Sequence, residues 1–531
     1  MRNRLVFYAG KGVDMAQIKV NNLTFAYEGS FDNVFENTSF VIDTNWKLGF
    51  VGRNGKGKTT FLNLLLGKYE YEGSISTTTV FDYFPYTTFA DDMDKPAYEL
   101  MEKWKPGVES WRVLCELPEL SIDAELLYRP FGILSFGERT KIMLAVLFSG
   151  SDNFLLIDEP TNHLDKEARK IVKNYLKTKK GFILVSHDRD VLDACIDHVL
   201  VLNRASIEVQ SGNFSSWWEN KEKADINALA ENAKHLKEIS KLEKAAEQAN
   251  RWAAKNENTK IGFDPIKEHD RCLATRATIG AKTKKMEKRV KSYEKRISRE
   301  IEEKEGLLND IEEVNDLKLM PLKYHKERLI FGRNYGFKYN DSQRKLFDGL
   351  TFEINNGDRA IIDGENGCGK SSLIHAMLDA KSVTAYENKN YEESGILSVP
   401  ENLIISYINQ DTSHLRGLLK DYCECKSLNY TLLLALLRQL DFERTQFGKP
   451  MEQYSEGQKK KVLIATSLIT PAHLYIWDEP LNYIDVFTRM QIEKLIETYK
   501  PTMLFVEHDA RFKEKIATKI IQINNLDTVK I

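Results

Sequence analysis

Short apolar runs in both halves of the chain predict buried strands. Each covers three or four residues, and the clearest are Leu48–Val51, Phe154–Ile157, Phe182–Val185, Ala360–Ile362, Leu474–Trp477 and Met503–Val506. Apolar runs without polar alternation are typical of parallel sheets covered on both faces. Helical patterns at Phe61–Leu66 and Leu373–Leu378 follow the first run of each half. The pattern therefore predicts an α/β domain in each half of the chain.

The middle of the chain has a helical period instead. Apolar residues recur at steps of three or four in two stripes: Ile226, Leu229, Ala233, Leu236, Ile239, Leu242, Ala246, Ala249 and Ala253, then Met286, Val290, Tyr293, Ile297, Ile301, Leu308 and Ile311. Two such stripes predict a long antiparallel α-helical hairpin. We expect its first helix to run from Glu219 to about Asn258, after a turn at 212–217. Gly262, Pro265 and Gly280 place the tip at about 260–280.

These patterns divide the chain into three predicted domains: residues 15–218, the hairpin at 219–320, and residues 321–531. Residues 1–14 precede a second methionine, Met15. We expect this leader to add nothing to the fold, with translation starting at Met15.

Five motifs occur twice in the same order. Phe25-Ala26-Tyr27 recurs as Phe337-Lys338-Tyr339, and the glycine-rich segment 52–59 recurs at 364–371, both offset by 312 residues. Ser135-Phe136-Gly137-Glu138 recurs as Ser455-Glu456-Gly457-Gln458, and Asp158-Glu159-Pro160 recurs as Asp478-Glu479-Pro480, both offset by 320. His187-Asp188 recurs as His508-Asp509, offset by 321. The chain is therefore a duplicated domain.

Both glycine-rich segments match the phosphate-binding loop G-x-x-x-x-G-K-[ST], between a predicted strand and a predicted helix. In that context a plain glycine turn is a poor alternative, since backbone N–H groups at a helix start converge on phosphates. Lys58 and Lys370 should reach the β- and γ-phosphates, and Thr59 and Ser371 should bind Mg²⁺. The predicted nucleotide-binding residues here are Gly52, Asn54, Gly55, Gly57, Lys58, Thr59, Thr60, Gly364, Asn366, Gly367, Gly369, Lys370, Ser371 and Ser372.

An Asp-Glu pair ends one buried strand in each half. Carboxylates at the carboxyl end of a parallel strand lie beside the phosphate loop. Asp158 and Asp478 fit the Mg²⁺ role, whereas Glu159 and Glu479 fit polarisation of the attacking water. ATP and Mg²⁺ are the expected cofactors.

Composition, charge and cysteine spacing exclude some classes of protein but do not identify a binding partner. Of 531 residues, 42% are hydrophobic, and 76 Lys and Arg against 78 Asp and Glu leave a net charge of −2, which excludes a uniformly basic nucleic-acid coat. The longest apolar runs, Ile142–Phe148 and Leu432–Leu437, are far shorter than the roughly 20 residues of a membrane helix. The six cysteines form no zinc-binding pattern. We expect a cytoplasmic protein without a membrane domain.

With both sets of motifs in place, the chain resembles the ATP-binding-cassette (ABC) ATPases, and the Ser135 and Ser455 segments resemble their signature motif. The resemblance implies two composite sites, each closed by the signature of the opposite cassette. Ser455, Gly457 and Gln458 would face Lys58, and Ser135, Gly137 and Glu138 would face Lys370. It also implies that Tyr27 and Tyr339 stack on adenine and that His187 and His508 contact the γ-phosphate. A lone histidine after an apolar strand is otherwise more often structural.

One position departs from the family pattern. ABC ATPases usually have a Mg²⁺-contacting Gln after the next strand, and Gln410 fits this role in the second half. The matching stretch of the first half, Tyr83-Phe84-Pro85-Tyr86, has Tyr86 instead. We therefore expect asymmetric hydrolysis, and equal residual ATPase rates in single Glu159→Gln and Glu479→Gln variants would contradict it.

The hairpin is unevenly charged. Residues 251–299 contain fifteen Lys or Arg and six Asp or Glu, a balance of +9, which suits either a polyanionic partner or an ordinary solvated coiled coil. Residues 158–165, Asp-Glu-Pro-Thr-Asn-His-Leu-Asp, are similar to the ABC-F class of tandem cassettes joined by a helical linker. Residues 479–485, Glu-Pro-Leu-Asn-Tyr-Ile-Asp, resemble the Lsa-type antibiotic-resistance members of that class.

This resemblance implies a monomer that pairs its own cassettes and associates with the 70S ribosome. The linker would enter the exit site beside P-site tRNA, reach 23S rRNA near the peptidyl-transferase centre, and protect against lincosamide, pleuromutilin and streptogramin A drugs. Basic side chains suit phosphate contacts and ring side chains suit base stacking. The candidate RNA-contacting residues are Phe263, His269, Arg271, Arg276, Lys282, Lys284 and Lys285.

There are three alternative functions, the first within the ABC-F class and the other two from other classes. A housekeeping ABC-F translation factor would share every motif but confer no drug tolerance. The ATPase subunit of a membrane transporter would lack a charged hairpin between its cassettes. In a DNA-repair or chromosome-organising ATPase, a coiled coil usually splits one cassette instead of joining two.

Overall fold

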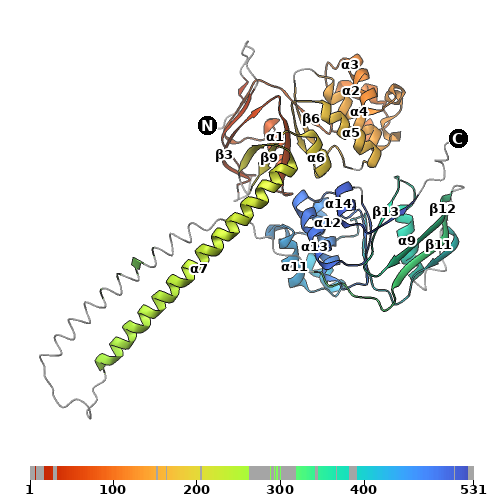
Figure 1. Cartoon of the computed structure of the whole chain (residues 1–531). Helices are drawn as coiled ribbons and strands as arrows, with labels where there is room; N and C mark the ends of the chain where they lie inside the picture. Colours follow the sequence, from red (N-terminus) through yellow and green to blue (C-terminus); the bar gives the residue numbers. More distant parts are fainter. Residues whose placement is uncertain are drawn as a thin grey trace, which may run out of the picture. The chain divides into compact units, whose positions relative to one another are not determined.

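The structure is a computed structural model. It describes residues 6–7, 17–27, 33–150, 153–162, 164–203, 206–261, 288, 292, 295–296, 299, 319–340, 345–365, 367–381, 391–507 and 509–523. The chain divides into two compact units: Met1–Trp217 together with Val314–Ile531, and Trp218–Glu313. The first unit contains both α/β halves (Figure 1).

The first half is built around a mostly parallel sheet. Its strands are β1 Val6–Phe7, β2 Gln17–Phe25, β3 Phe35–Asp43, β4 Lys47–Gly52, β5 Glu72–Thr77, β6 Phe81–Phe84, β7 Phe154–Asp158, β8 Phe182–Val185, β9 His198–Leu202 and β10 Ile207–Ser211. Its helices are α1 Lys58–Leu65, α2 Ala97–Trp104, α3 Ser110–Glu116, α4 Phe136–Phe148, α5 Lys166–Thr178 and α6 Arg189–Cys195. Within the described residues the sheet order is β10-β9-β4-β8-β7-β6, and β1-β5-β2-β3 form a second sheet.

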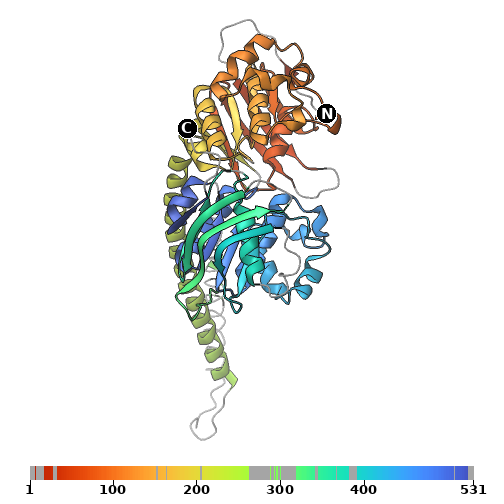
Figure 2. The same ribbon diagram turned by 90° about the vertical axis from the view of Figure 1, so that its right-hand side faces the viewer.

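The second half repeats this plan. Its strands are β11 Arg328–Tyr339, β12 Lys345–Asn355, β13 Arg359–Asp363, β14 Tyr391–Ser398, β15 Ile405–Ile408, β16 Leu474–Asp478, β17 Met503–Val506 and β18 Lys519–Gln522. Its helices are α9 Lys370–Lys381, α10 Leu419–Cys425, α11 Tyr430–Gln439, α12 Glu456–Ile469, α13 Val486–Tyr499 and α14 Ala510–Ile516. The described sheets are β15-β16-β17-β13-β18 and β12-β11-β14, whose long strands β11 and β12 lie side by side in Figure 2.

The two parallel sheets have the same topology. The order β9-β4-β8-β7-β6 of the first half corresponds to β18-β13-β17-β16-β15 of the second. All four neighbouring pairs in each set are parallel, and each of the six apolar runs predicted to be buried strands lies in one of these strands. The duplicated α/β fold predicted from the sequence is therefore confirmed.

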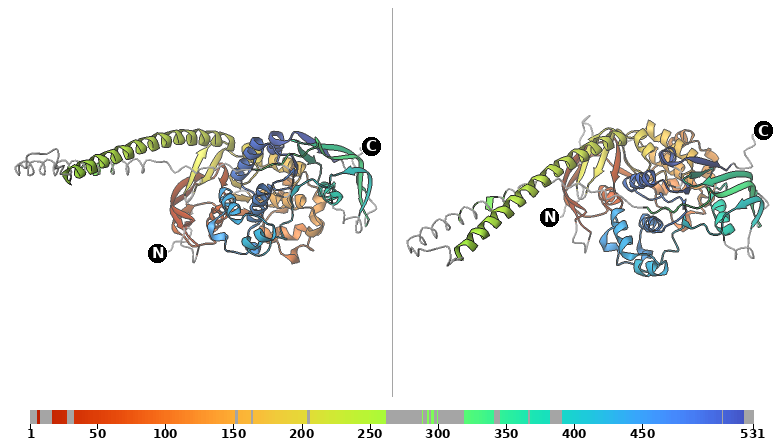
Figure 3. Two further views of the ribbon diagram at one scale, coloured as in Figure 1. Left: turned by 90° about the horizontal axis from the view of Figure 1, so that it is seen from below. Right: turned by 60° about the horizontal axis from the view of Figure 1, so that its bottom comes forward.

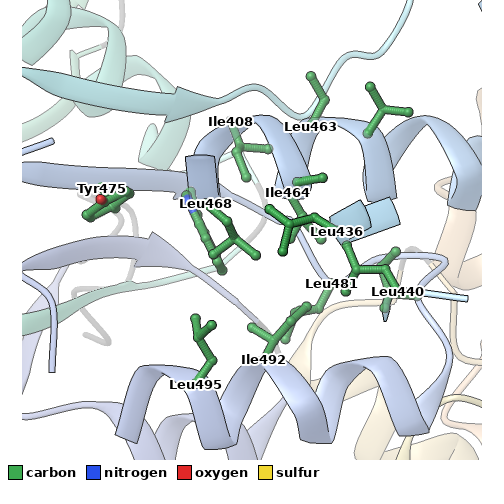
Figure 4. Packing of buried hydrophobic residues seen from close by; sticks show 14 of the residues in the cluster. Ile408, Leu436, Leu440, Leu463, Ile464, Leu468, Tyr475, Leu481, Ile492 and Leu495 are labelled. Atoms are coloured by element: carbon green, nitrogen blue, oxygen red, sulfur yellow. The ribbon is translucent and has the colours of Figure 1, made fainter. Parts of the chain in front are cut away.

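Helices cover the parallel sheet because its strands are apolar on both faces. In the second half, Tyr475 and Trp477 of β16 are fully buried in a core that also receives leucine and isoleucine side chains from α11, α12 and α13. Figure 4 shows Ile464 and Leu468 of α12 and Ile492 of α13 within this core. The carboxyl ends of the strands, which carry the Asp-Glu pairs, are held in place by this packing.

The linker begins differently from the prediction. Helix α7 runs from Phe214 to Ile261 without a break and curves gently along its length (Figure 3). The turn predicted at 212–217 is wrong except at Gly212, whose φ of 116° is left-handed. Asn213 Oδ1 accepts a hydrogen bond from Ser216 N at 3.0 Å and so starts the helix. Phe214 and Trp217 are buried, which makes the first turn of α7 part of the α/β unit.

Most of the rest of the linker cannot be compared with its prediction. Every residue of the second apolar stripe lies outside the described residues, and so does the tip predicted at about 260–280, apart from the last two residues of α7. All seven candidate RNA-contacting residues also lie outside the described residues. The hairpin and the three domain boundaries therefore stay predictions. No described helix has both the length and the apolar character needed to cross a membrane.

The leader differs from the expectation in one respect. Val6 and Phe7 form β1, which pairs in parallel with Ser76 and Thr77 of β5. The expectation that residues 1–14 add nothing to the fold is therefore wrong, because backbone groups of this segment extend a sheet of the first half.

Candidate functional site

The two phosphate loops have the local geometry that the sequence predicted. Each follows an interior strand of a parallel sheet, β4 or β13, and leads into α1 or α9. Gly57 has a φ of 110° and stands at the N-terminus of α1, where an added side-chain carbon would lie 2.5 Å from Val34 Cγ1. Both the backbone conformation and the space therefore require glycine at this position. Asn366 of the second loop lies outside the described residues.

The loop lysines are buried and held by backbone oxygens. Lys58 Nζ donates to Gly52 O at 2.6 Å and to Arg53 O at 3.1 Å, and Lys370 Nζ donates to Gly364 O and Glu365 O, both at 2.9 Å. Burial lowers the pKa of Lys58, although nearby carboxylates, Asp485 foremost, oppose the shift. Binding of phosphate would add further negative charge beside this buried ammonium group.

The carboxylates lie beside the loop hydroxyls, as expected. Thr59 Oγ1 donates to Asp158 Oδ2 at 3.1 Å, and a hydrogen bond likewise joins Ser371 to Asp478. Burial raises the pKa of both aspartates. Asp478 Oδ1 is buried and has no hydrogen-bond partner among the described residues. A carboxylate-hydroxyl pair with a spare buried oxygen fits Mg²⁺, which prefers oxygen ligands and retains several waters. When bound, Mg²⁺ would neutralise phosphate charge.

The two glutamates predicted to be catalytic have different surroundings. Both have a left-handed backbone, with φ of 51° at Glu159 and 46° at Glu479. His187 Nε2 lies 3.2 Å from Glu159 Oε1, and burial raises the pKa of Glu159 and lowers that of His187. Glu479 Oε2 instead accepts hydrogen bonds from Gln410 and Asn482, both at 2.8 Å. The second histidine, His508, lies outside the described residues.

Strand register fixes the comparison between Gln410 and Tyr86. Tyr83 of β6 pairs with Leu156, and Tyr407 of β15 pairs with Ile476, the counterpart of Leu156. Tyr86 therefore occupies the position of Gln410. Its ring stacks on Trp104, and its hydroxyl donates to Asp82 at 3.3 Å.

Tyr83, which no sequence motif marks, lies beside the carboxylate of Asp158 in the first half. Tyr83 donates its hydroxyl to Asp158 Oδ2 at 3.2 Å, and burial raises the pKa of this phenol. One signal for Tyr83 was available in the sequence. It lies one residue before the end of β6, and alternate residues of a strand point to the same face of the sheet.

The tyrosines predicted to bind adenine lie at the phosphate loops. Tyr27 OH is 2.6 Å from Thr60 Oγ1, and Tyr339 OH is 2.9 Å from Ser372 Oγ. The two residues are 44% and 41% exposed, and adenine stacking on them stays a prediction.

Both signature segments begin helices. Ser135 caps α4 and Ser455 caps α12, each by a capping box with the residue three positions later, Glu138 or Gln458. Gly457 lies at the first site, where an added side-chain carbon would be 2.6 Å from Tyr483 O and 3.4 Å from Asn54 Nδ2. The structure therefore brings the second signature to the first phosphate loop.

The second site is a pocket of about 440 Å³. The second half contributes Tyr339, Leu346, Gly367, Gly369, Lys370, Ser371, Ser372, Gln410, Glu479 and Asn482 to its lining, and the first half contributes Leu164 and Arg169. Among the described residues Ser135 and Gly137 do not line it. An added side-chain carbon on Gly137 would contact Leu164 Cδ2 at 3.8 Å, so the first signature lies directly behind the pocket wall.

Comparison with known proteins agrees with this geometry. The ABC transporter family matches residues 35–162 and 347–482. A ribosome protection protein, VmlR of Bacillus subtilis (strain 168), is 26% identical over 515 residues, which cover 94% of this chain and 86% of VmlR. ABC transporter F family member 5 of Arabidopsis thaliana is 24% identical, and the match covers 96% of this chain and 75% of the plant protein. The chain is a tandem ABC ATPase of the ABC-F type.

The two halves are therefore ABC cassettes. A crystal structure of archaeal ribosome recycling factor aABCE1 in complex with stalk protein aP1 matches with a TM-score of 0.56. At 17% identity, covering 94% of this chain and 87% of that one, it confirms the fold alone.

Glu507 is a buried carboxyl group that no sequence motif marks. Glu507 accepts a hydrogen bond from Leu481 N at 2.9 Å. The corresponding residues of the first cassette are Ser186 and Thr161, whose hydroxyl groups lie near each other. Burial raises the pKa of Glu507 from 4.5 to about 7, although Arg489 and the Leu481 hydrogen bond oppose the shift and Glu479 and Asp509 support it.

The Glu507→Gln variant should be more stable than the parent chain at high pH. A raised pKa means that Glu507 contributes stability in its protonated form, and that this contribution is lost as the pH rises from about 4.5 through about 7. Glutamine keeps the acceptor for Leu481 N without the charge. We expect a gain of about 3 kcal/mol at pH 8 that shrinks toward pH 5, measured by chemical denaturation. An equal change at both pH values, or the same profile in the exposed control Glu353→Gln, would contradict this.

Proposed function

We propose that each cassette binds ATP with its own phosphate loop and the signature segment of the other cassette. Lys58 and Lys370 would hold the phosphates, Tyr27 and Tyr339 the adenine. Thr59, Asp158, Ser371, Asp478 and Gln410 would hold Mg²⁺. Glu159 and Glu479 would orient the attacking water, with His187 and His508 near the γ-phosphate. The contact of Gly457 with the Asn54 region supports this pairing at the first site.

We further propose that ATP binding drives this chain onto the bacterial ribosome, where it protects the peptidyl-transferase centre from lincosamide, pleuromutilin and streptogramin A antibiotics. VmlR, which is similar over 94% of this chain, is named as a ribosome protection protein. A helix of 48 residues, about 70 Å long, provides the reach needed for an element that acts far from the ATP sites.

The observation that carries the proposal is the contact of α7's first turn with both cassettes. Ser215 binds Asp193 of the first cassette through its backbone N–H and its hydroxyl. Arg511 of the second cassette donates to Ser215 Oγ at 3.3 Å and forms an ion pair with the same Asp193. Trp217 packs edge-on against Phe487 of the second cassette. Any change in the pairing of the cassettes must therefore move the base of the linker.

Expression in a drug-sensitive bacterium tests the proposal. We expect the full chain to raise the inhibitory concentration of at least one of the three drug classes. A variant with residues 260–280 replaced by a short Gly-Ser turn should lose this effect but keep its ATPase activity, since the ATP sites lie in the other compact unit. Equal protection by the shortened variant would contradict the role of the tip.

A housekeeping role in translation is the second candidate. ABC transporter F family member 5 supports it, because it is nearly as similar and its name indicates no resistance. Ribosome binding without a rise in tolerance to any of the three drug classes would favour this role.

A further inference from the structure

An ion pair between the cassettes joins the first phosphate loop to the second cassette. Arg53 Nη1 lies 3.0 Å from Asp441 Oδ1, and the side chains are only 19% and 23% exposed. Asp441 follows α11 and has a left-handed φ of 61°. The pair is therefore partly shielded from water, where an ion pair is stronger than at an open surface.

The same loop residues also hold the phosphate-binding lysine. Arg53 contributes its carbonyl oxygen to Lys58 Nζ, and Asn54 contributes Oδ1 at 3.2 Å. Asn54 also donates through Nδ2 to Tyr483 O of the second cassette at 2.7 Å. Two consecutive residues around Lys58 are thus tied to the opposite cassette. When the first site opens, both ties must break.

The repeat shows that the second site cannot form this ion pair. Glu365 stands at the position of Arg53, and Ser121 stands at the position of Asp441. Ser121 has a φ of 54°, close to that of Asp441, which supports the correspondence. Glu365 O still accepts a hydrogen bond from Lys370 Nζ, so the backbone contact with the loop lysine is retained. The side chains that correspond to Arg53 and Asp441, however, are a glutamate and a serine. A glutamate and a serine offer no pair of opposite charges.

We propose that Arg53 and Asp441 are a positioning pair that makes the first site release nucleotide more slowly than the second. The pair does not touch the reacting atoms. It acts through the loop around Lys58, by keeping the second cassette closed over the first site. This rests on the proposed binding of ATP at the two composite sites and does not depend on the ribosomal role.

Stopped-flow displacement of a fluorescent, non-hydrolysable ATP analogue from the Mg²⁺-containing full chain tests the proposal. We expect two dissociation phases, of which Lys58→Ala abolishes the slower. Arg53→Gln and Asp441→Asn should each accelerate the slower phase by about two- to fivefold and leave the faster phase unchanged. The double variant should be no faster than either single variant, because both changes remove one interaction. Asparagine tolerates the left-handed backbone at position 441.

Grafting the pair onto the second site provides the converse test. Glu365→Arg combined with Ser121→Asp should slow the faster phase by a similar factor. The matched control is Arg328→Gln, which removes an exposed ion pair with Glu353 inside one cassette and should alter neither phase. A single dissociation phase in the parent chain, additive effects in the double variant, or a graft without effect in folded protein would overturn the proposal.

Discussion

ATP hydrolysis by the Glu159→Gln/Glu479→Gln double variant is expected to fall by at least about 100-fold, the usual loss on removal of a general base. ATP binding should persist, because glutamine keeps an oxygen that accepts the hydrogen bonds now made to Glu479 by Gln410 and Asn482. Phosphate release and ATP retention on a filter measure the two quantities.

The matched control for this variant is Glu353→Gln. Glu353 lies on β12, far in sequence from both Asp-Glu pairs, so this control should hydrolyse ATP at the parental rate. Residual activity within tenfold of the parent chain would show that neither glutamate has the catalytic role assigned to it. The two single variants should differ from each other, because Tyr86 in the first cassette replaces Gln410, which contacts Glu479 in the second.

The Arg189→Ala variant is expected to lose about 3 kcal/mol or more of stability. Arg189 forms a two-pronged ion pair with Glu493 across the cassettes, and the two side chains are only 7% and 1% exposed. Alanine would leave the buried Glu493 carboxylate with Lys515, at 3.6 Å, as its ion-pair partner among the described residues. Removing a single partner costs more than replacing both, since the other charge stays buried.

Chemical denaturation of three variants separates these effects. Arg189→Ala should be the least stable, and Arg189→Met/Glu493→Leu, which removes both charges and keeps apolar volume, should recover much of the loss. Arg328→Ala, which breaks an exposed pair at 3.7 Å, should cost less than about 1 kcal/mol. If Arg189→Ala resembled Arg328→Ala, the pair would not hold the cassettes together.

Features that depend on neighbours in sequence were predictable. The apolar runs became β4, β7, β8, β13, β16 and β17 because a fully apolar strand needs cover on both faces. The phosphate loops and the signature segments were recognisable from residues within eight positions of each other. Asp188 and Asp509, which follow the repeated histidines, prove to be helix caps, another local role.

Features that depend on distant contacts were not predictable. Phe214 and Trp217 look like the end of a domain in the sequence, but burial against the α/β unit extends α7 back to Phe214. The pairs Arg53–Asp441 and Arg189–Glu493 join residues more than 300 positions apart, and no local pattern marks them. The burial that perturbs the pKa values of Glu159 and Glu507 also arises only in the folded chain.

Sedimentation of the Glu159→Gln/Glu479→Gln variant with 70S ribosomes tests most directly whether closure of the cassettes on ATP sets the linker for ribosome binding. The variant should pellet with ribosomes in ATP and stay in the supernatant in ADP, because only ATP holds both composite sites shut. Equal amounts in the pellet with either nucleotide, or none with both, would contradict the account.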